Sequence, residues 1–153
     1  MSDFSARGGW WLVGQALLSA ALVASWWLTG SDWSTATTIA GWLLVGGGVA
    51  VAVAGLVALG SNLSVFPSPV GGARLVDRSV FRFVRHPVYS GLVAGSVGGS
   101  LVDGNLVGLV VAVVLAGLLA GKSAAEEVRL AAAVDGYSDY LERVRWRMIP
   151  GIL

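Results

Sequence analysis

Hydrophobic positions fall into long runs that are separated by short polar segments, a pattern that predicts membrane-spanning helices. The runs 9–29 and 37–60 each have the roughly 20 apolar residues that a helix needs to cross a bilayer. Two shorter runs, 88–102 and 106–121, flank a polar turn at 103–105 and predict a close helical hairpin. We therefore predict an all-α, polytopic membrane bundle of four spans, in which spans three and four form this hairpin.

Composition supports a membrane protein and excludes several other classes. The chain has 153 residues, of which 56% are hydrophobic and 12% are charged, so it is too apolar for a soluble domain and is expected to be a single membrane domain. Its net charge of +1, without a basic run interleaved with aromatics, argues against nucleic-acid binding. The lack of cysteine excludes thiolate chemistry, and the single histidine argues against a metal site.

The basic residues predict how the chain is oriented in the membrane. Arg7, four arginines in the loop 61–87 and five basic residues in the segment 122–153 account for all ten, and they share one side of the four-span arrangement. The positive-inside rule therefore predicts that both termini and the loop are cytoplasmic. The expected location is a bacterial or archaeal inner membrane.

Small residues and tryptophans suggest how the spans pack. Small residues let membrane helices approach closely, and the second run has four of them at four-residue spacing: Gly46, Ala50, Ala54 and Ala58. Glycines are also expected to join the two hairpin helices: Gly91, Gly95 and Gly99 in the first, Gly117 and Gly121 in the second. Tryptophan pairs at 10–11 and 26–27 lie one apolar length apart and are expected at the two membrane interfaces.

The polar segment 63–91 interrupts the apolar pattern and holds the first candidate site residues. Pro87 disfavours helical geometry at the preceding residue and suits the first turn of a helix. Arg85 and His86 are therefore expected at a helix N-terminus, where free N–H groups and the helix dipole attract a carboxylate or phosphate. Alternatively, Arg85 is a topogenic charge at the membrane border. Four arginines would form one basic face if this segment were helical: Arg74, Arg78, Arg82 and Arg85.

A second polar cluster follows the fourth span on the same side of the membrane. Glu126 and Glu127 are expected to meet Arg85, His86 and Tyr89 there, in a composition that suits a zwitterionic ligand with an apolar partner. Alternatively, Glu126 pairs along its own helix with a basic residue at 122 or 129 in a solvated ladder. Further on, an apolar face with helical spacing predicts a short amphipathic cytoplasmic helix: Tyr137, Tyr140, Leu141 and Val144.

These motifs together resemble a known family. RHPVYSG at 85–91, then Glu126-Glu127, Leu130, two tyrosines and a terminal Arg-Met-Ile-Pro at 147–150 resemble the isoprenylcysteine carboxyl methyltransferase family. The chain is also similar to the related membrane phospholipid N-methyltransferases. The resemblance covers roughly 59–151. It has two departures: Ser79 stands where a glycine is common, and Val134-Asp135 stands where Phe-Gly is common.

The resemblance implies S-adenosylmethionine as methyl donor. Its carboxylate would meet His86 and Tyr89, while Glu126 or Glu127 would face its amino group or sulfonium. Tyr137 and Tyr140 would cover the adenosine, and Gly91 belongs to the same binding motif. Arg85 and Glu127 are the residues that it places closest to catalysis.

The acceptor implied by the resemblance is a lipophilic molecule or a lipid that enters from the bilayer and carries a carboxylate, an amine or a thiol. Membrane lipids are therefore the expected partners, and the sequence leaves the oligomeric state open. Two other functions remain possible from the sequence: a membrane reductase, because sterol reductases share a similar core, and a non-catalytic scaffold that binds anionic headgroups.

Overall fold

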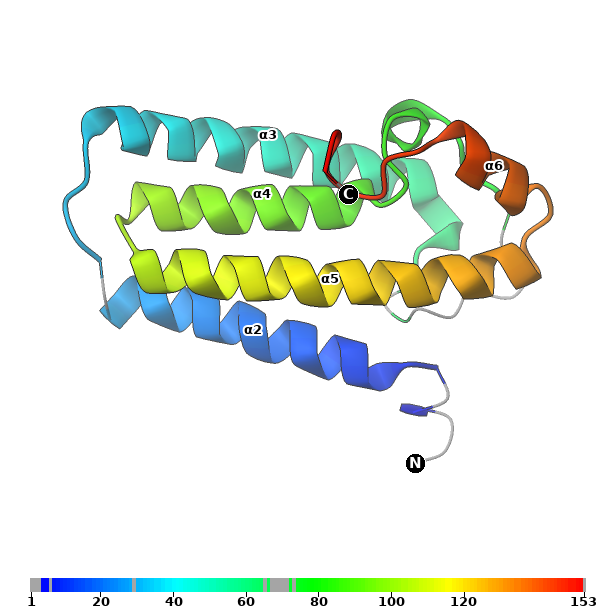
Figure 1. Cartoon of the computed structure of the whole chain (residues 1–153), viewed down its shortest axis with the longest axis horizontal. Coiled ribbons are helices and arrows are strands. Elements are labelled where there is room, and N and C mark those ends of the chain that lie inside the picture. Colours follow the sequence, from blue (N-terminus) through cyan, green and yellow to red (C-terminus); the bar gives the residue numbers. More distant parts are fainter. Residues whose placement is uncertain are drawn as a thin grey trace.

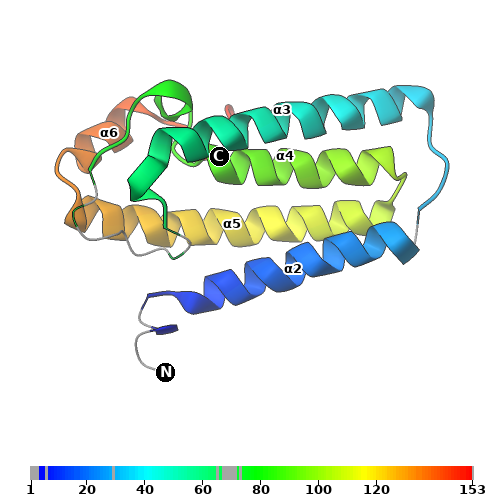
Figure 2. The ribbon, with the colours of Figure 1, turned by 180° about the vertical axis from the view of Figure 1, so that it is seen from behind.

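The computed structural model describes residues 4–5, 7–28, 30–64, 66, 72 and 74–152, and within these ranges the chain forms helices and no strand. Four long helices lie side by side along the molecule (Figures 1 and 2): α2 (Gly9–Leu28), α3 (Thr35–Leu59), α4 (Pro87–Val102) and α5 (Leu106–Ala133). Helix α4 lies between α3 and α5, and α2 packs on α5. The short helix α6 (Tyr137–Arg143) sits at one end of the bundle.

The predicted all-α fold with helices suited to a membrane is confirmed, whereas the predicted count of four spans is not. Three helical stretches are long and apolar enough to cross a membrane: 9–27, 35–62 and 106–133. Helix α4 is apolar but has 16 residues, or about 24 Å at about 1.5 Å per residue. Helix α5 continues without a break past residue 121, where the fourth span was predicted to end.

Glycines bring α3 and α4 into close contact. Gly41, Gly48 and Gly55 are buried at seven-residue spacing on α3, and they face Gly98, Gly91 and Pro87 of α4. A seven-residue spacing returns to almost the same helix face, since an ideal helix drifts by only about 20° per heptad. A methyl group at Gly98 would lie 2.6 Å from the Gly41 carbonyl oxygen, so this contact requires hydrogen in place of a side chain.

The predicted glycine contact between the two hairpin helices is wrong. Gly91 faces α3, Gly99 faces the Trp26 ring on α2, and Gly121 faces the Trp11 ring. A Cβ placed at Gly95 or Gly117 would meet nothing within 4 Å. The four-residue series on α3 does not define the contact either: Gly46 is open and exposed, because each step of four residues turns the helix face by about 40°.

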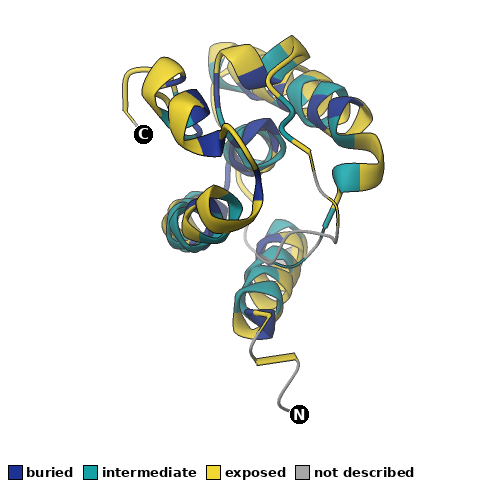
Figure 3. Cartoon of the chain, turned by 90° about the vertical axis from the view of Figure 1, so that its right-hand side faces the viewer, coloured by how far each residue is buried: buried dark blue, intermediate teal, exposed yellow. Residues whose placement is uncertain are grey.

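In each tryptophan pair that was expected at a membrane interface, one member is exposed and the other packs inside the bundle. Trp10 and Trp27 are 70% and 85% exposed and face outward, as interface anchors do. The other member of each pair, Trp11 or Trp26, packs against a glycine inside the bundle. Figure 3 shows this general division, with buried positions between the helices and exposed positions on their outer faces.

The end of the bundle opposite α6 is closed by a network of polar groups. Asn105 is fully buried and caps α5 by accepting a hydrogen bond from Gly108 N at 2.8 Å. Its amide donates to the Ser25 carbonyl on α2 at 2.7 Å. Ser31 Oγ donates to the carbonyl of Gly104, a turn residue with a φ of 61°. The turn between α4 and α5 is thereby fixed to the end of α2, as buried polar groups require.

The arginine-rich segment before α4 does not form the helical basic face that its spacing suggested. Residues 74–77 have no regular secondary structure, and only Ser79–Arg82 form a short 3-10 turn, η2. Ser79 has a φ of 56°, in the left-handed region that favours glycine, which explains why glycine is common at this point in the resembling proteins. The other 3-10 turn, η1 (Gly60–Asn62), ends α3.

We predict that Gly98→Ala lowers the free energy of unfolding by about 1–3 kcal/mol, because the added methyl group meets backbone atoms of Gly41 and Val45 that no side-chain rotation can move. Thermal unfolding of the purified protein in detergent measures the effect. The matched control is Gly46→Ala, which fills open space on the same pair of helices. Equal stability of the two variants would contradict the glycine contact.

Candidate active site

A cavity of about 300 Å³ lies at the α6 end of the bundle, where all the long helices contribute walls. Leucines from the first two helices and the turn after them form its apolar side: Leu12, Leu56, Leu59 and Leu63. The polar lining comes mainly from the start of α4 and from α5: Arg85, His86, Tyr89, Lys122 and Glu126. Tyr137 and Tyr140 of α6 complete the lining. The cavity therefore joins an apolar wall to a compact set of charges.

Glu127 anchors the polar side from behind the cavity wall. It is only 6% exposed, and it meets three partners from two other parts of the chain. Arg147 donates to both of its carboxylate oxygens, at 2.9 and 3.2 Å. His86 Nε2 lies 3.2 Å from Oε1, and an Arg85 nitrogen lies 3.4 Å from the same oxygen. A buried carboxylate is stable only with such charged partners.

Arg85 fixes the segment that follows α6 in addition to meeting Glu127. Its guanidinium donates to the carbonyls of Leu141, at 2.7 Å, and Val144. Its backbone N–H donates to the Trp146 carbonyl, and that of His86 donates to the Arg147 carbonyl at 2.8 Å. The two residues that were expected to attract an anion at the start of α4 thus also hold the 144–148 segment against this helix.

His86 lies between the two glutamates and stacks on Tyr89. The Tyr89 hydroxyl donates to Glu126 at 3.0 Å, and His86 Nδ1 is 3.7 Å from the same carboxylate oxygen. The two rings are parallel within 2°, with their centroids 5.4 Å apart. Lys122, which was the alternative partner of Glu126, donates instead to Gln15. His86, Tyr89 and Glu126 therefore form one connected group at the cavity surface.

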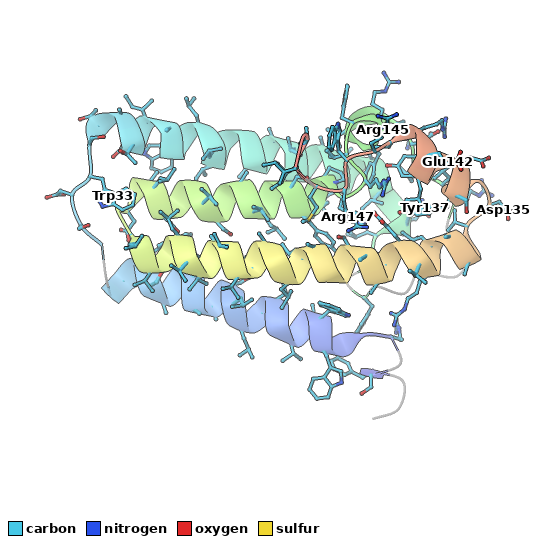
Figure 4. All side chains as sticks on the ribbon, viewed as in Figure 1. Trp33, Asp135, Tyr137, Glu142, Arg145 and Arg147 are labelled. Carbon is cyan, nitrogen blue, oxygen red and sulfur yellow. The ribbon has the colours of Figure 1, made fainter. Side chains whose placement is uncertain are left out.

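The tyrosines of α6 form a buried wall. Tyr140 is fully buried and its hydroxyl donates to the Phe81 carbonyl at 2.7 Å, while Tyr137 packs 5.5 Å from it, centroid to centroid. Burial raises the pKa of both tyrosines, and the negative charge of Glu127 raises that of Tyr137 further, so both hydroxyls stay neutral. Figure 4 shows Tyr137 and Arg147 at this end of the bundle, with Trp33 at the other. The predicted amphipathic helix is confirmed, since these tyrosines cluster with Val134 and Val144.

Sequence reasoning placed most of these side chains at one end of the bundle, but it assigned no role to Arg147. The signal was its position in the terminal Arg-Met-Ile-Pro motif, which carried no information about its partner. Ser90 was also missed; its hydroxyl donates to the Met148 carbonyl at 2.6 Å. Gly91, which was expected to bind the cofactor, is not part of the cavity lining and packs against Gly48 and Ala52 of α3.

A comparison with protein families finds one match. The family model described as phospholipid methyltransferase matches residues 36–131, which include nearly all of α3, α4 and α5. The match contains the motif at 85–91 and both glutamates, whereas α2, α6 and Arg147 lie outside it. No curated protein and no solved structure matches the chain significantly.

We predict that Glu127→Gln lowers the free energy of unfolding by about 3 kcal/mol, because it leaves two arginines and the His86 ring, all buried or half-buried, without their shared carboxylate. Thermal unfolding measures this loss. Added salt should change it little, since a buried charge cluster is poorly screened. The same substitution at the exposed Glu142 is the control and should change stability by less than about 0.5 kcal/mol. Similar losses in both variants would contradict the anchoring role of Glu127.

Proposed function

The chain belongs to the phospholipid methyltransferase family, and on this basis we propose that it is a membrane-embedded, S-adenosylmethionine-dependent methyltransferase that modifies a lipophilic acceptor. One observation carries the proposal: His86, Tyr89 and Glu126 meet at the surface of a cavity whose other side is apolar. A polar methyl donor and a lipophilic acceptor need such a combination, because polar side chains bind the donor and apolar side chains bind the acceptor.

The donor groups around the cavity fit the cofactor. Glu126 offers a carboxylate to an ammonium or sulfonium. His86 and Tyr89 contact Glu126 in this structure, and they would exchange that contact for the carboxylate of the cofactor when it binds. Tyr137 and Tyr140 offer aromatic surface to an adenine ring. The volume of about 300 Å³ is at the lower end of the range of small-molecule sites, about 300–1,000 Å³.

The geometry favours Glu126 over Glu127 as the glutamate that contacts the cofactor. Glu126 lines the cavity, and Tyr89 and His86 meet it through one carboxylate oxygen, Oε2. Glu127 does not line the cavity and is engaged by two arginines and the His86 ring. We propose that Glu127 and Arg85 act as positioning residues, which hold His86 and the 144–148 segment in place.

The bound cofactor supplies an activated methyl group on a sulfonium, so the protein needs neither a nucleophile nor a metal of its own. The task of the side chains is to orient the two reactants and to exclude water; orientation alone accounts for about 7–11 kcal/mol in favourable cases. The leucines from α2 and α3 would hold the acceptor's hydrocarbon part next to the polar group. We propose a lipid with an amine, carboxylate or thiol as acceptor, and no observation favours the reductase or the scaffold.

We further propose that α4 is a fourth, short crossing and that the α6 end faces the cytoplasm. Helix α4 is antiparallel to α3 and packs along it, so it occupies the same layer as the three long helices. The basic residues at 7, 74–85, 122–129 and 143–147 lie toward the α6 end, and Asp32 and Asp103 lie at the other, which fits the positive-inside rule.

We predict that S-adenosylhomocysteine binds the purified protein and that Glu126→Gln and Tyr89→Phe each weaken this binding about tenfold or more, because each removes a polar group from the cavity surface. Isothermal titration calorimetry measures the affinity, and Glu142→Gln serves as an exposed control of the same chemistry.

Unchanged affinity in both cavity variants would contradict the assigned site, and a wild-type protein without affinity for the ligand would contradict the function. The acceptor is then sought directly, by mass spectrometry of lipid extracts that have been incubated with the protein and an isotopically labelled methyl donor. A labelled lipid should appear with the wild type and be reduced with Glu126→Gln.

We predict that a membrane-impermeant maleimide labels Asp32→Cys but not Glu142→Cys in intact bacterial cells that express the protein. Both positions are exposed, and the chain has no cysteine of its own to react. Glu142 and Trp33, the next residue after Asp32, lie at opposite ends of the bundle (Figure 4). Both variants should be labelled after the membrane is permeabilised. Labelling of Glu142→Cys in intact cells would overturn the orientation.

A further inference from the structure

Lys122 is a buried cation in the cavity that the proposed function does not use. Its side chain extends from α5 toward α2 and is only 3% exposed, yet both Lys122 and Gln15 line the cavity. The ammonium nitrogen donates to Gln15 Oε1 at 2.8 Å and lies 5.1 Å from the centroid of the Tyr89 ring. In the described part of the chain, no carboxylate lies within 4.0 Å of this nitrogen.

The contacts of Lys122 do not satisfy all the hydrogen-bond donors of its ammonium group. It has three N–H donors, and a neutral carboxamide satisfies one of them. Glu126, one helical turn away, attracts the ammonium electrostatically, but its closest contacts are with Tyr89 and His86. Ionisable residues within membrane helices are costly and mark ligand sites more often than they support the fold. The remaining N–H donors of the ammonium are therefore best satisfied by acceptor atoms of a ligand.

We infer that Lys122 and Gln15 form a subsite for one anionic group, a carboxylate or a phosphate. The ammonium provides the charge, and the Gln15 carboxamide, whose oxygen accepts from Lys122, has its N–H donors left to bind the same anion. Gln15 belongs to α2, outside the residues that the family model matches, whereas Lys122 lies within them.

The inference deepens the proposed function and rests on it for the identity of the anion. The same subsite can take the carboxylate of the methyl donor or the phosphate of a phospholipid acceptor, and two pairs of probes separate these sources. S-adenosylhomocysteine is compared with methylthioadenosine, which lacks the amino-acid part. Dihexanoyl phosphatidylethanolamine is compared with dihexanoylglycerol, which lacks the phosphate.

Three variants test the subsite by calorimetric titration. Lys122→Met removes the charge, and Gln15→Glu keeps the size of the side chain but places a carboxylate next to the ammonium. Both substitutions should weaken the binding of one of the two anionic probes about tenfold or more. The affinity for the matched probe that lacks the anion should change by no more than about twofold. Lys122→Arg keeps the charge, and its affinity for the same probe should stay within about threefold of the wild-type value. If Lys122→Met does not fold, the isosteric Gln15→Glu carries the test.

The weakened probe identifies the source of the anion. Loss of S-adenosylhomocysteine binding assigns the subsite to the donor, and loss of phospholipid binding assigns it to the acceptor. Equal affinities of the wild type, Lys122→Met and Gln15→Glu for both anionic probes would overturn the inference, as would a wild type that binds neither. A wild type that binds the phospholipid but not S-adenosylhomocysteine would count against the proposed methyl transfer alone.

Discussion

The buried carboxylate of Glu127 joins three parts of the chain that are far apart in sequence. It receives Arg85 and His86 from the segment that starts α4, and Arg147 from the segment after α6. Taking a carboxylate out of water costs several kcal/mol, and that cost is recovered only when charged donors surround it in good geometry. The site therefore exists as a unit, because none of these side chains has its partners unless the others are in place.

The two ends of the bundle use polar groups in opposite ways. At the end opposite α6, Asn105 binds the start of α5 and the end of α2, so its polar groups are satisfied within the protein. At the α6 end, polar groups surround a cavity and some of their hydrogen-bonding capacity faces it. Between the ends, glycines on α3 and α4 allow backbone contact and hold the start of α4 against its neighbour. This combination of one closed end, a tight middle and one open end is what a membrane enzyme needs.

The sequence was sufficient to predict what depends on local pattern. Long apolar runs predicted the helices, Pro87 predicted the start of α4, and the spacing from Tyr137 to Val144 predicted α6. Contacts between residues on different helices were harder to predict from the sequence. The sequence has many glycines at several spacings, and which of them meet depends on how each helix is rotated about its axis. Seven-residue spacing on α3 and α4 defines the contact, whereas the more visible four-residue series leaves Gly46 open. Arg147 lies 20 residues from Glu127, and no local rule connects the two.

The contact between the 144–148 segment and the start of α4 has a consequence for biosynthesis. The main-chain donors of Arg85 and His86 have their carbonyl partners at Trp146 and Arg147. Those two residues follow α5 in the chain and are therefore synthesised after it. A nascent chain that ends with α5 has all four long helices but lacks the partners that these two main-chain donors have in the folded protein.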